Sequence, residues 1–109
     1  HADKWDVTPH VDHILGQSNE AKQIAPPITT ATDGALILRF LCMSDNDITV
    51  IVQPAGYTLL ESVIVTDGNT GFASLVKATA GVDAPGLWDN THGTVTADTA
   101  EAAIAIKPA

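Results

Sequence analysis

The side chains best suited to recognising a ligand gather in one stretch, at Trp88, Asp89, Asn90 and His92. An exposed indole can stack on a sugar ring, and carboxylate, amide and imidazole groups can hydrogen-bond to sugar hydroxyls. This composition predicts a glycan-binding loop. A small β domain often uses a large aromatic residue to fill one end of its core, so a buried Trp88 stays open as the other interpretation.

Two histidines, His10 and His13, lie three residues apart with Asp12 between them. On one face of a helix this spacing could hold a metal ion. Pro9 precedes the pair, however, and no helical period follows, while residues three apart on a strand point to opposite faces. We therefore interpret both histidines as solvated and expect no metal site here.

Three clusters of Asp and Asn occupy expected turns, at residues 45–47, 67–69 and 89–90. Oxygen ligands at such positions bind Ca²⁺ in proteins, but none of the clusters has the ligand spacing of an EF-type loop. Asp, Asn and Gly are also the residues that tight turns need for their backbone angles. We expect ordinary turns and keep calcium as the alternative.

Little in the sequence points to catalysis. Ser44, Ser62 and Ser74 lack the Gly-x-Ser-x-Gly setting of an activated serine, and no histidine is placed beside them. Glu61 and Glu101 lie within expected strands, where outward-facing positions account for both. We predict a protein that is not an enzyme and uses no cofactor.

The 109-residue chain is acidic, with 13 Asp and Glu against 5 Lys and Arg and a formal net charge of −8. Such a surface repels phosphate, which predicts no binding to nucleic acid or to an anionic membrane. The longest apolar run, Ala35–Met43, is shorter than the about 18 residues of a membrane span and contains Arg39. The one cysteine, Cys42, is expected to be a small buried apolar residue.

From residue 28 onwards, turn signals recur at short intervals between β-prone stretches without a helical period. This pattern predicts an all-β fold, an antiparallel, jelly-roll-like β-sandwich over residues 28–109, after an irregular N-terminal segment over residues 1–27. The expected strands are Ile28–Thr32, Ala35–Met43, Ile48–Val52, Tyr57–Thr66, Gly71–Ala80, Thr94–Thr96 and Ala102–Ile106.

Three expectations about these stretches are specific. Ala35–Met43 is apolar at nearly every position, so we expect it to be buried on both faces or nearly so. Asp83–Gly93 is expected to be a long loop. Thr99–Ala105 is rich in Ala and could form a helix by propensity, but its residues alternate with period two, which favours a final strand.

Short segments spread over most of the chain carry a resemblance: Asp6–Asp12, Asp33–Ala35, Pro54–Tyr57, Ala78–Gly81 with Trp88, and Ala103–Ala109. They resemble the second half of a jelly-roll-like β-sandwich module found in phage and prophage structural proteins and in some bacterial surface proteins. The matching pieces are mostly turns and strand ends, so they speak for a fold more than for a role.

The resemblance implies a structural or adhesive component of a virion, such as a capsid-decoration, head-fibre or tail-fibre part. It also implies a homo-oligomer, with a trimer favoured, or a larger virion or filament assembly, in a virion or extracellular location. Two other functions stay open: a glycan-binding module of a secreted or surface protein, and a strand-exchanging subunit of an extracellular filament.

In that module several more strands precede the matching part, whereas this chain begins at His1. We therefore expect an upstream segment or a partner to supply the missing strands of an otherwise incomplete sandwich. Without them, apolar faces such as those of Ala35–Met43 would stay uncovered, which soluble monomers rarely tolerate.

Overall fold

β-Strands are the main secondary structure of the described part of the chain. The structure is a computed structural model that describes residues 4–8, 10–18, 22–44, 48–66, 68–90 and 96–109. Its strands are β1 (His10–Ser18), β2 (Lys22–Ile24), β3 (Ile28–Thr30), β4 (Ala35–Ser44), β5 (Thr58–Val65), β6 (Gly68–Lys77), β7 (Gly81–Asp83), β8 (Leu87–Asp89) and β9 (Thr96–Ile106). No described residue lies in an α-helix, which confirms the all-β fold.

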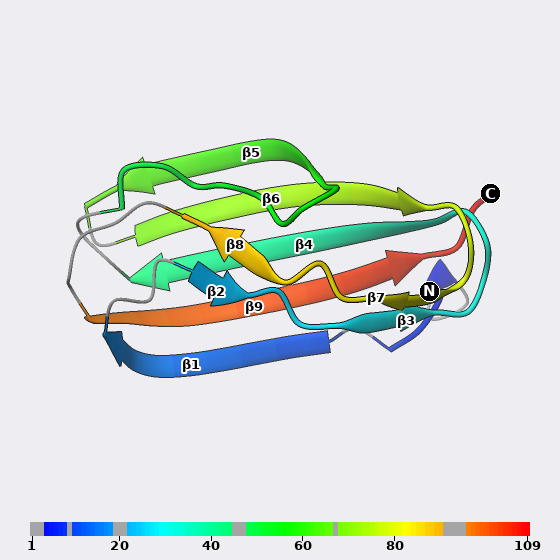
Figure 1. Cartoon of the computed structure of the whole chain (residues 1–109), viewed down its shortest axis with the longest axis horizontal. Helices are drawn as coiled ribbons and strands as arrows, with labels where there is room; N and C mark the ends of the chain where they lie inside the picture. The colour runs from blue at the N-terminus through cyan, green and yellow to red at the C-terminus, as the bar shows by residue number, and fades with distance from the viewer. Residues whose placement is uncertain (1–3, 9, 19–21, 45–47, 67, 91–95) are drawn as a thin grey trace.

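Five long strands form one antiparallel sheet in the order β1-β9-β4-β6-β5 (Figure 1). β4 lies at its centre and pairs along nearly its whole length with β9 on one side and β6 on the other. The C-terminal strand β9 therefore lies between the N-terminal strand β1 and the central strand β4. This order makes β1 and β5 the two edges of the sheet.

The second layer is a two-stranded ribbon in two sections, β2 with β8 and β3 with β7. Both sections keep one continuous antiparallel register, from Lys22 opposite Asp89 to Thr30 opposite Gly81. Between them the Ala25 amide donates to the Gly86 carbonyl at 2.8 Å. The ladder is interrupted around Pro26, Pro27 and Pro85, because proline has no amide hydrogen to donate.

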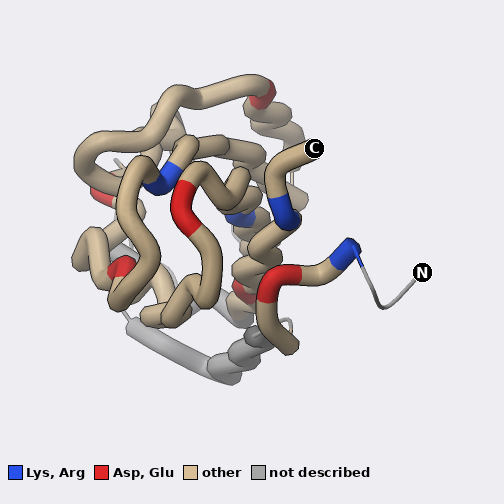
Figure 2. Tube along the Cα trace, turned by 90° about the vertical axis from the view of Figure 1, so that its right-hand side faces the viewer, with Lys and Arg blue, Asp and Glu red and all other residues tan. Residues whose placement is uncertain are grey.

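The ribbon covers one side of the five-stranded sheet. In Figure 1 β2, β3, β7 and β8 all lie in front of that sheet. Two antiparallel layers packed face to face form a β-sandwich, as the sequence predicts. Figure 2 looks at the end of the molecule where the C-terminus lies, with Lys4 beside Lys107.

Side chains of β4 alternate between the two sides of the sheet. Those on the side of the ribbon are buried: Ala35, Ile37, Arg39, Leu41 and Met43. Those on the other side are more exposed: Leu36, Leu38, Phe40, Cys42 and Ser44. The expectation that this strand is buried on both faces is therefore wrong, because the second layer lies on one side only. We call the two sides the inner face and the outer face.

Trp88 fills the interior between the layers. Its indole is fully buried and belongs to the core that also contains Ile51, Tyr57 and Met43. Gly71 of β6 leaves the space that the indole needs. A Cβ at this position would lie 2.9 Å from the Cζ3 atom of Trp88 and 2.8 Å from the Cγ2 atom of Ile51.

Two stretches behave differently from the sequence-based expectation. Ile48–Val52 is rich in β-branched residues but is not one of the strands. It is used as core filling, with Ile48 and Ile51 buried, and is tied to β8 by the Asp89 amide, which donates to the Val52 carbonyl at 3.0 Å. His10–Ser18 forms β1 and pairs with β9, although the sequence favours at most a short extended piece at Val11–Leu15 within an irregular segment.

The last third of the chain is more regular than expected. Leu87–Asp89 forms β8 within the stretch expected to be a loop. Thr96–Ile106 is one long strand, which joins the two short final strands expected from the sequence and confirms the choice of a strand over a helix. Its inward positions carry small side chains such as Ala103 and Ala105, which are fully buried.

The tight packing of Trp88 against Gly71 generates the first testable prediction. Gly71→Ala forces a methyl group into the indole and Ile51, and we expect it to lower the free energy of unfolding by about 1–3 kcal/mol. Denaturant unfolding followed by circular dichroism measures the change. Gly68→Ala is the matched control on the same strand, because its Cβ meets Val65 at an ordinary 3.7 Å. Equal stability of the two variants would contradict the packing.

Candidate functional site

The residues predicted to form a glycan-binding loop do not lie together on the surface. Trp88 is fully buried, so its indole offers no face to a sugar ring. Asn90 is also buried, and its Oδ1 atom accepts a hydrogen bond from the Val52 amide at 2.9 Å. Asp89 is exposed, and His92 lies outside the described residues.

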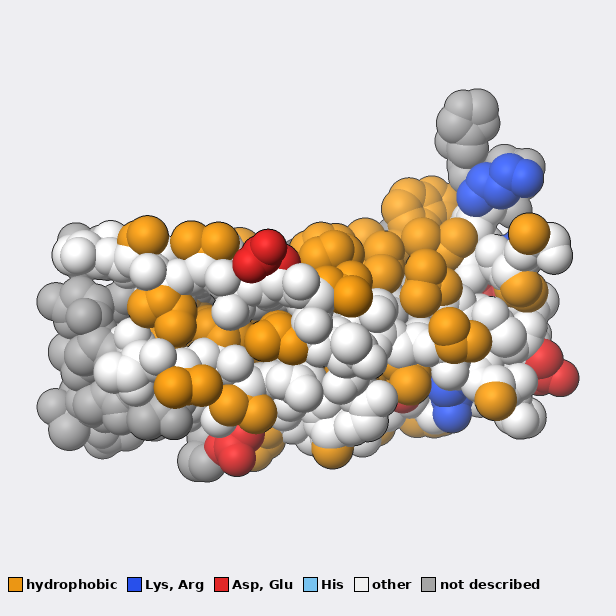
Figure 3. Space-filling view, turned by 90° about the horizontal axis from the view of Figure 1, so that it is seen from above, with side chains coloured by type: hydrophobic (Ala, Val, Ile, Leu, Met, Phe, Trp, Pro, Cys, Tyr) orange, Lys and Arg blue, Asp and Glu red, His pale blue; other side chains and the backbone are white. Residues whose placement is uncertain are grey.

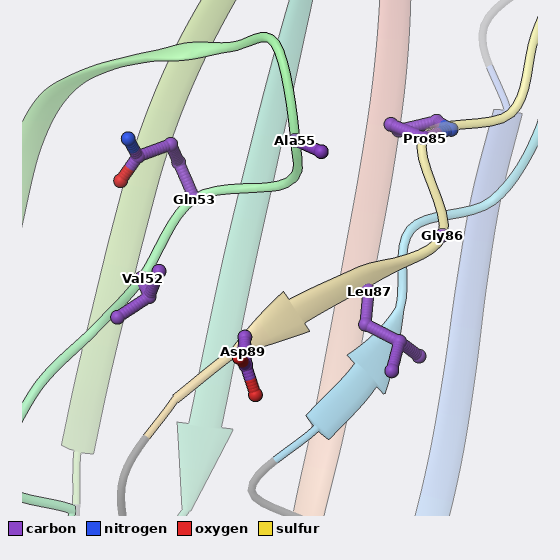
Figure 4. A pocket seen from close by; sticks show the side chains of 7 residues that line it. All are labelled: Val52, Gln53, Ala55, Pro85, Gly86, Leu87 and Asp89. Atoms are coloured by element: carbon purple, nitrogen blue, oxygen red, sulfur yellow. The ribbon is translucent and has the colours of Figure 1, made fainter.

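Asp89 lines a groove of about 570 Å³ between β8 and the segment that precedes β5. The groove is lined by Val52, Gln53, Ala55, Pro85, Gly86, Leu87 and Asp89 (Figure 4). These are mostly apolar or backbone surfaces, with the Gln53 amide and the Asp89 carboxylate as the polar side chains. The described lining contains neither an aromatic ring nor a cation, so it points to no particular ligand.

The described residues contain no group of three or more His, Cys, Asp or Glu that could hold a metal ion. His10, Asp12 and His13 lie on β1, but their side chains are outside the described part. The cluster at residues 45–47 and Asp67 also lie outside it. Asn69, from the second candidate calcium cluster, is buried. Its Oδ1 atom accepts a hydrogen bond from the Val65 amide at 3.2 Å, as a turn residue would.

A buried polar cluster centred on Arg39 joins the two layers of the sandwich. The Arg39 Nε atom donates to the Tyr57 hydroxyl at 2.8 Å, and its Nη1 atom donates to the Pro26 carbonyl at 2.6 Å. Its Nη2 atom forms an ion pair with the Asp83 carboxylate at 2.8 Å. The Tyr57 hydroxyl donates to the same carboxylate oxygen at 2.5 Å. β4 thus supplies the cation, and the ribbon supplies the carboxylate and the carbonyl.

The electrostatics of this cluster favour a neutral tyrosine beside a paired charge. Burial raises the pKa of Tyr57 well above its ordinary value of 10.0, and the hydrogen bond to Asp83 raises it further. The Arg39 guanidinium offsets part of this rise and lies 5.2 Å from the centre of the Tyr57 ring. Arg39 is fully buried and Tyr57 nearly so, so the cluster holds the layers together and presents no reactive group to solvent.

The sequence contains one signal for this cluster. Arg39 interrupts the longest apolar run, and a buried arginine needs a carboxylate or carbonyl partner. Its partner Asp83 lies 44 residues away in a stretch expected to be a loop. Sequence spacing alone therefore gave no reason to place the two side chains together.

Two further acids lie inside the fold. Asp6 accepts hydrogen bonds from the Thr32 hydroxyl and from the Ala31 amide, which ties the N-terminal segment to the β3–β4 turn. Burial raises its pKa, but these hydrogen bonds outweigh burial and hold the pKa below the ordinary 3.8. Glu101 was expected to face outward and instead lies buried on the inner face, whereas Glu61 is exposed as expected. Successive residues of β9 alternate between the two faces, so Glu101 lies on the same inner face as Ala103 and Ala105.

The described outer face of the five-stranded sheet is mainly apolar across β9, β4, β6 and β5. Its cross-strand rows are Trp5-Ile106-Leu36-Val76, Ile104-Leu38-Ser74-Thr58, Ala102-Phe40-Phe72-Glu61 and Ala100-Cys42-Thr70-Val63. Within these rows Glu61, on the edge strand β5, is the one charged residue. Arg39 and Glu101 of the same sheet point inward. Arg39 and Glu101 are therefore buried in a core that is otherwise mainly apolar, and the described outer face carries few charges.

A shallow depression lies within the outer face. Phe40 and Phe72 stack there, with ring centres 4.6 Å apart and planes inclined by 12°. The depression has a volume of about 260 Å³ and is lined by Phe40, Leu41, Cys42, Glu61, Thr70, Gly71 and Phe72. Cys42 is exposed, which corrects the expectation of a buried cysteine, because even-numbered residues of β4 point outward.

The edge strand β5 extends this apolar surface. It pairs with β6 on one side and ends the sheet order. Leu60, Val63, Ile64 and Val65 are each between 41% and 54% exposed. Figure 3 looks onto this edge and shows hydrophobic side chains along much of its length. A bulge between Leu59 and Glu61, together with the Glu61 carboxylate, limits how well another strand can pair here.

Comparisons of the chain with protein-family models, with curated proteins and with solved structures each found no match. Among the described residues, no helix has the length and apolar character needed to cross a bilayer. The main feature of the candidate functional site is the apolar outer face.

The Arg39 cluster generates the second prediction. Asp83→Asn leaves the buried guanidinium without a charged partner, and we expect it to lower the free energy of unfolding by about 3–5 kcal/mol. Tyr57→Phe keeps the ion pair and removes two hydrogen bonds, so we expect a smaller loss of about 1–3 kcal/mol.

Denaturant unfolding measures both changes, with Asp33→Asn as the control. Asp33 is an exposed aspartate whose Oδ1 atom accepts the Ala80 amide at 2.7 Å, a bond that asparagine can also make. We expect this control to lose less than about 0.5 kcal/mol. An Asp83→Asn variant as stable as Asp33→Asn would show that the cluster does not hold the layers together.

Proposed function

We propose that the protein is a non-catalytic structural or adhesive module that works by being built into a larger assembly. It joins copies of itself or a shell-type protein through the outer face of its five-stranded sheet. The assembly is extracellular, and a virion is the best candidate.

The single observation that carries this proposal is the apolar, nearly uncharged outer face. Isolated exposed apolar residues are normal on a protein surface, but contiguous apolar patches of more than a few hundred Å² mark interaction sites. Here the patch runs across β9, β4 and β6 and onto β5, with Val76 63% exposed and Trp5 39% exposed. In a chain of net charge −8, a face on which Glu61 is the one charged residue among those described is suited to being covered.

The placement of the polar side chains supports a structural role. Arg39, Tyr57 and Asp83 are engaged with one another between the layers, and Asp6 ties down the N-terminal segment. These groups stabilise the sandwich. Among the described residues, the outer face and the β5 edge are the features that best suit protein–protein contact.

The resemblance to phage and prophage structural modules supplies the class of assembly. It favours a decoration, head-fibre or tail-fibre part, which functions by attachment and stabilisation. A trimer or a larger array of subunits fits that class, and so does a location on the outside of a particle.

The test compares two valines that are equally exposed on opposite sides of the sandwich. Val76 lies on the outer face and Val82 on β7 of the ribbon, and each is 63% exposed. Glutamate at either position meets solvent in the free chain, so neither variant disturbs the core. We expect Val76→Glu to reduce incorporation into the native assembly by about tenfold or more, because the assembly buries its charge.

Incorporation is measured as the fraction of protein that sediments with high-molecular-weight material from the natural source, and circular dichroism checks folding. Val82→Glu should incorporate like the unmodified protein. Equal incorporation of both variants would contradict a role for the outer face. Recovery of the unmodified protein entirely as free chain would contradict the proposed function as a whole.

A further inference from the structure

We infer that a second copy of this chain covers the outer face, so that two sandwiches meet sheet to sheet across a twofold axis centred near Phe40 and Phe72. The inference rests on the proposed function and names the partner of the same surface. Three features of the described residues carry it: the area of the face, the placement of charge around it, and its shape.

The area of the face is that of a weak, reversible dimer. The rows from Val76 to Val63 span seven residues along each strand and lie on the four strands β9, β4, β6 and β5. At about 3.4 Å per residue and about 4.8 Å between strands, the face measures roughly 24 Å by 19 Å, or about 460 Å². Two such faces bury about 900 Å², the range of weak and transient interfaces.

The charges of the described residues allow two acidic copies to approach on this face. Asp6, Asp83 and Glu101 are buried, while Asp33 lies at the β3–β4 turn and Asp89 on the ribbon. Glu61 alone among the described carboxylates lies on the outer face, at its margin on β5. A strongly basic partner would find few carboxylates here to pair with, whereas an identical apolar face meets no unpaired charge at its centre.

The shape of the face suits packing of one sheet on another. Sheets in sandwiches pack about 10 Å apart through interdigitating apolar side chains. The outer face has both a projection and a hollow for such interdigitation: the stacked Phe40 and Phe72 rings and the depression beside them. A twofold axis near Phe40 and Phe72 brings the rings and the depressions of both copies to one place. Side chains of each copy then enter the depression of the other.

Cys42 provides a built-in probe of this interface. It is the one cysteine of the chain, it is exposed, and it lines the depression. In the inferred dimer its thiol is covered, and it reacts with a small thiol reagent only through the dissociated fraction. Sedimentation velocity and the rate of thiol labelling therefore report the same event by independent means.

The experiment uses the purified unmodified chain, Val76→Glu and Val82→Glu over a wide range of concentration. We expect the unmodified chain and Val82→Glu to form dimers in which labelling of Cys42 slows by about tenfold or more as concentration rises. We expect Val76→Glu to dimerise about 100-fold more weakly, because a buried unpaired carboxylate costs several factors of ten in affinity. Its Cys42 should react at one rate at all concentrations.

Two results overturn the inference, and each leaves a different part of the account standing. If the purified chain stays monomeric with a reactive Cys42 while native incorporation still depends on Val76, another protein covers the face and the proposed function survives. If the chain forms dimers or trimers in which Cys42 stays reactive, the copies meet elsewhere, for example through the β5 edge.

Discussion

A guanidinium group removed from water determines much of this structure. Arg39 is fully buried in the middle of the central strand, where an unpaired charge would be strongly destabilising. Four groups prevent this: the Tyr57 hydroxyl, the Pro26 carbonyl, and the carbonyl and carboxylate of Asp83. Since Pro26 and Asp83 belong to the ribbon and Arg39 to the sheet, satisfying the charge also fixes how the two layers dock.

The direction of Arg39 also determines which side of the sheet is left open. Because successive residues of a strand point to opposite faces, an inward Arg39 turns Phe40 and Leu38 outward. Because residues paired across neighbouring strands point to the same face, Ala102 and Ile104 of β9 and Phe72 of β6 also point outward. The proposed role in assembly is therefore a consequence of the buried charge, since the face that needs a partner is the one opposite to it.

The β architecture could be predicted because it depends on local signals. Turn residues mark the strand limits, and the alternation of Phe72 and Ala73 along β6 identifies its two sides. The orientation of β4 could not be predicted, since Ala35–Met43 is apolar at both even and odd positions and Arg39 is its one polar residue. Its orientation depends on Asp83, 44 residues away, and the exposure of Cys42 follows from it. The burial of Trp88 likewise depends on the space at Gly71.

The ionisation of Tyr57 tests most directly which face of the sheet is the interior. It is the one tyrosine of the chain, so tyrosinate absorbance reports it alone. Burial raises its pKa above 10.0, so its contribution to stability is complete below pH 10.0 and declines as the pH rises beyond it. We predict that tyrosinate appears only together with loss of the folded circular dichroism signal, whereas the denatured chain titrates near 10.0. Tyrosinate forming near pH 10.0 in a chain that stays folded would contradict the buried Arg39 cluster, and with it the assignment of the outer face.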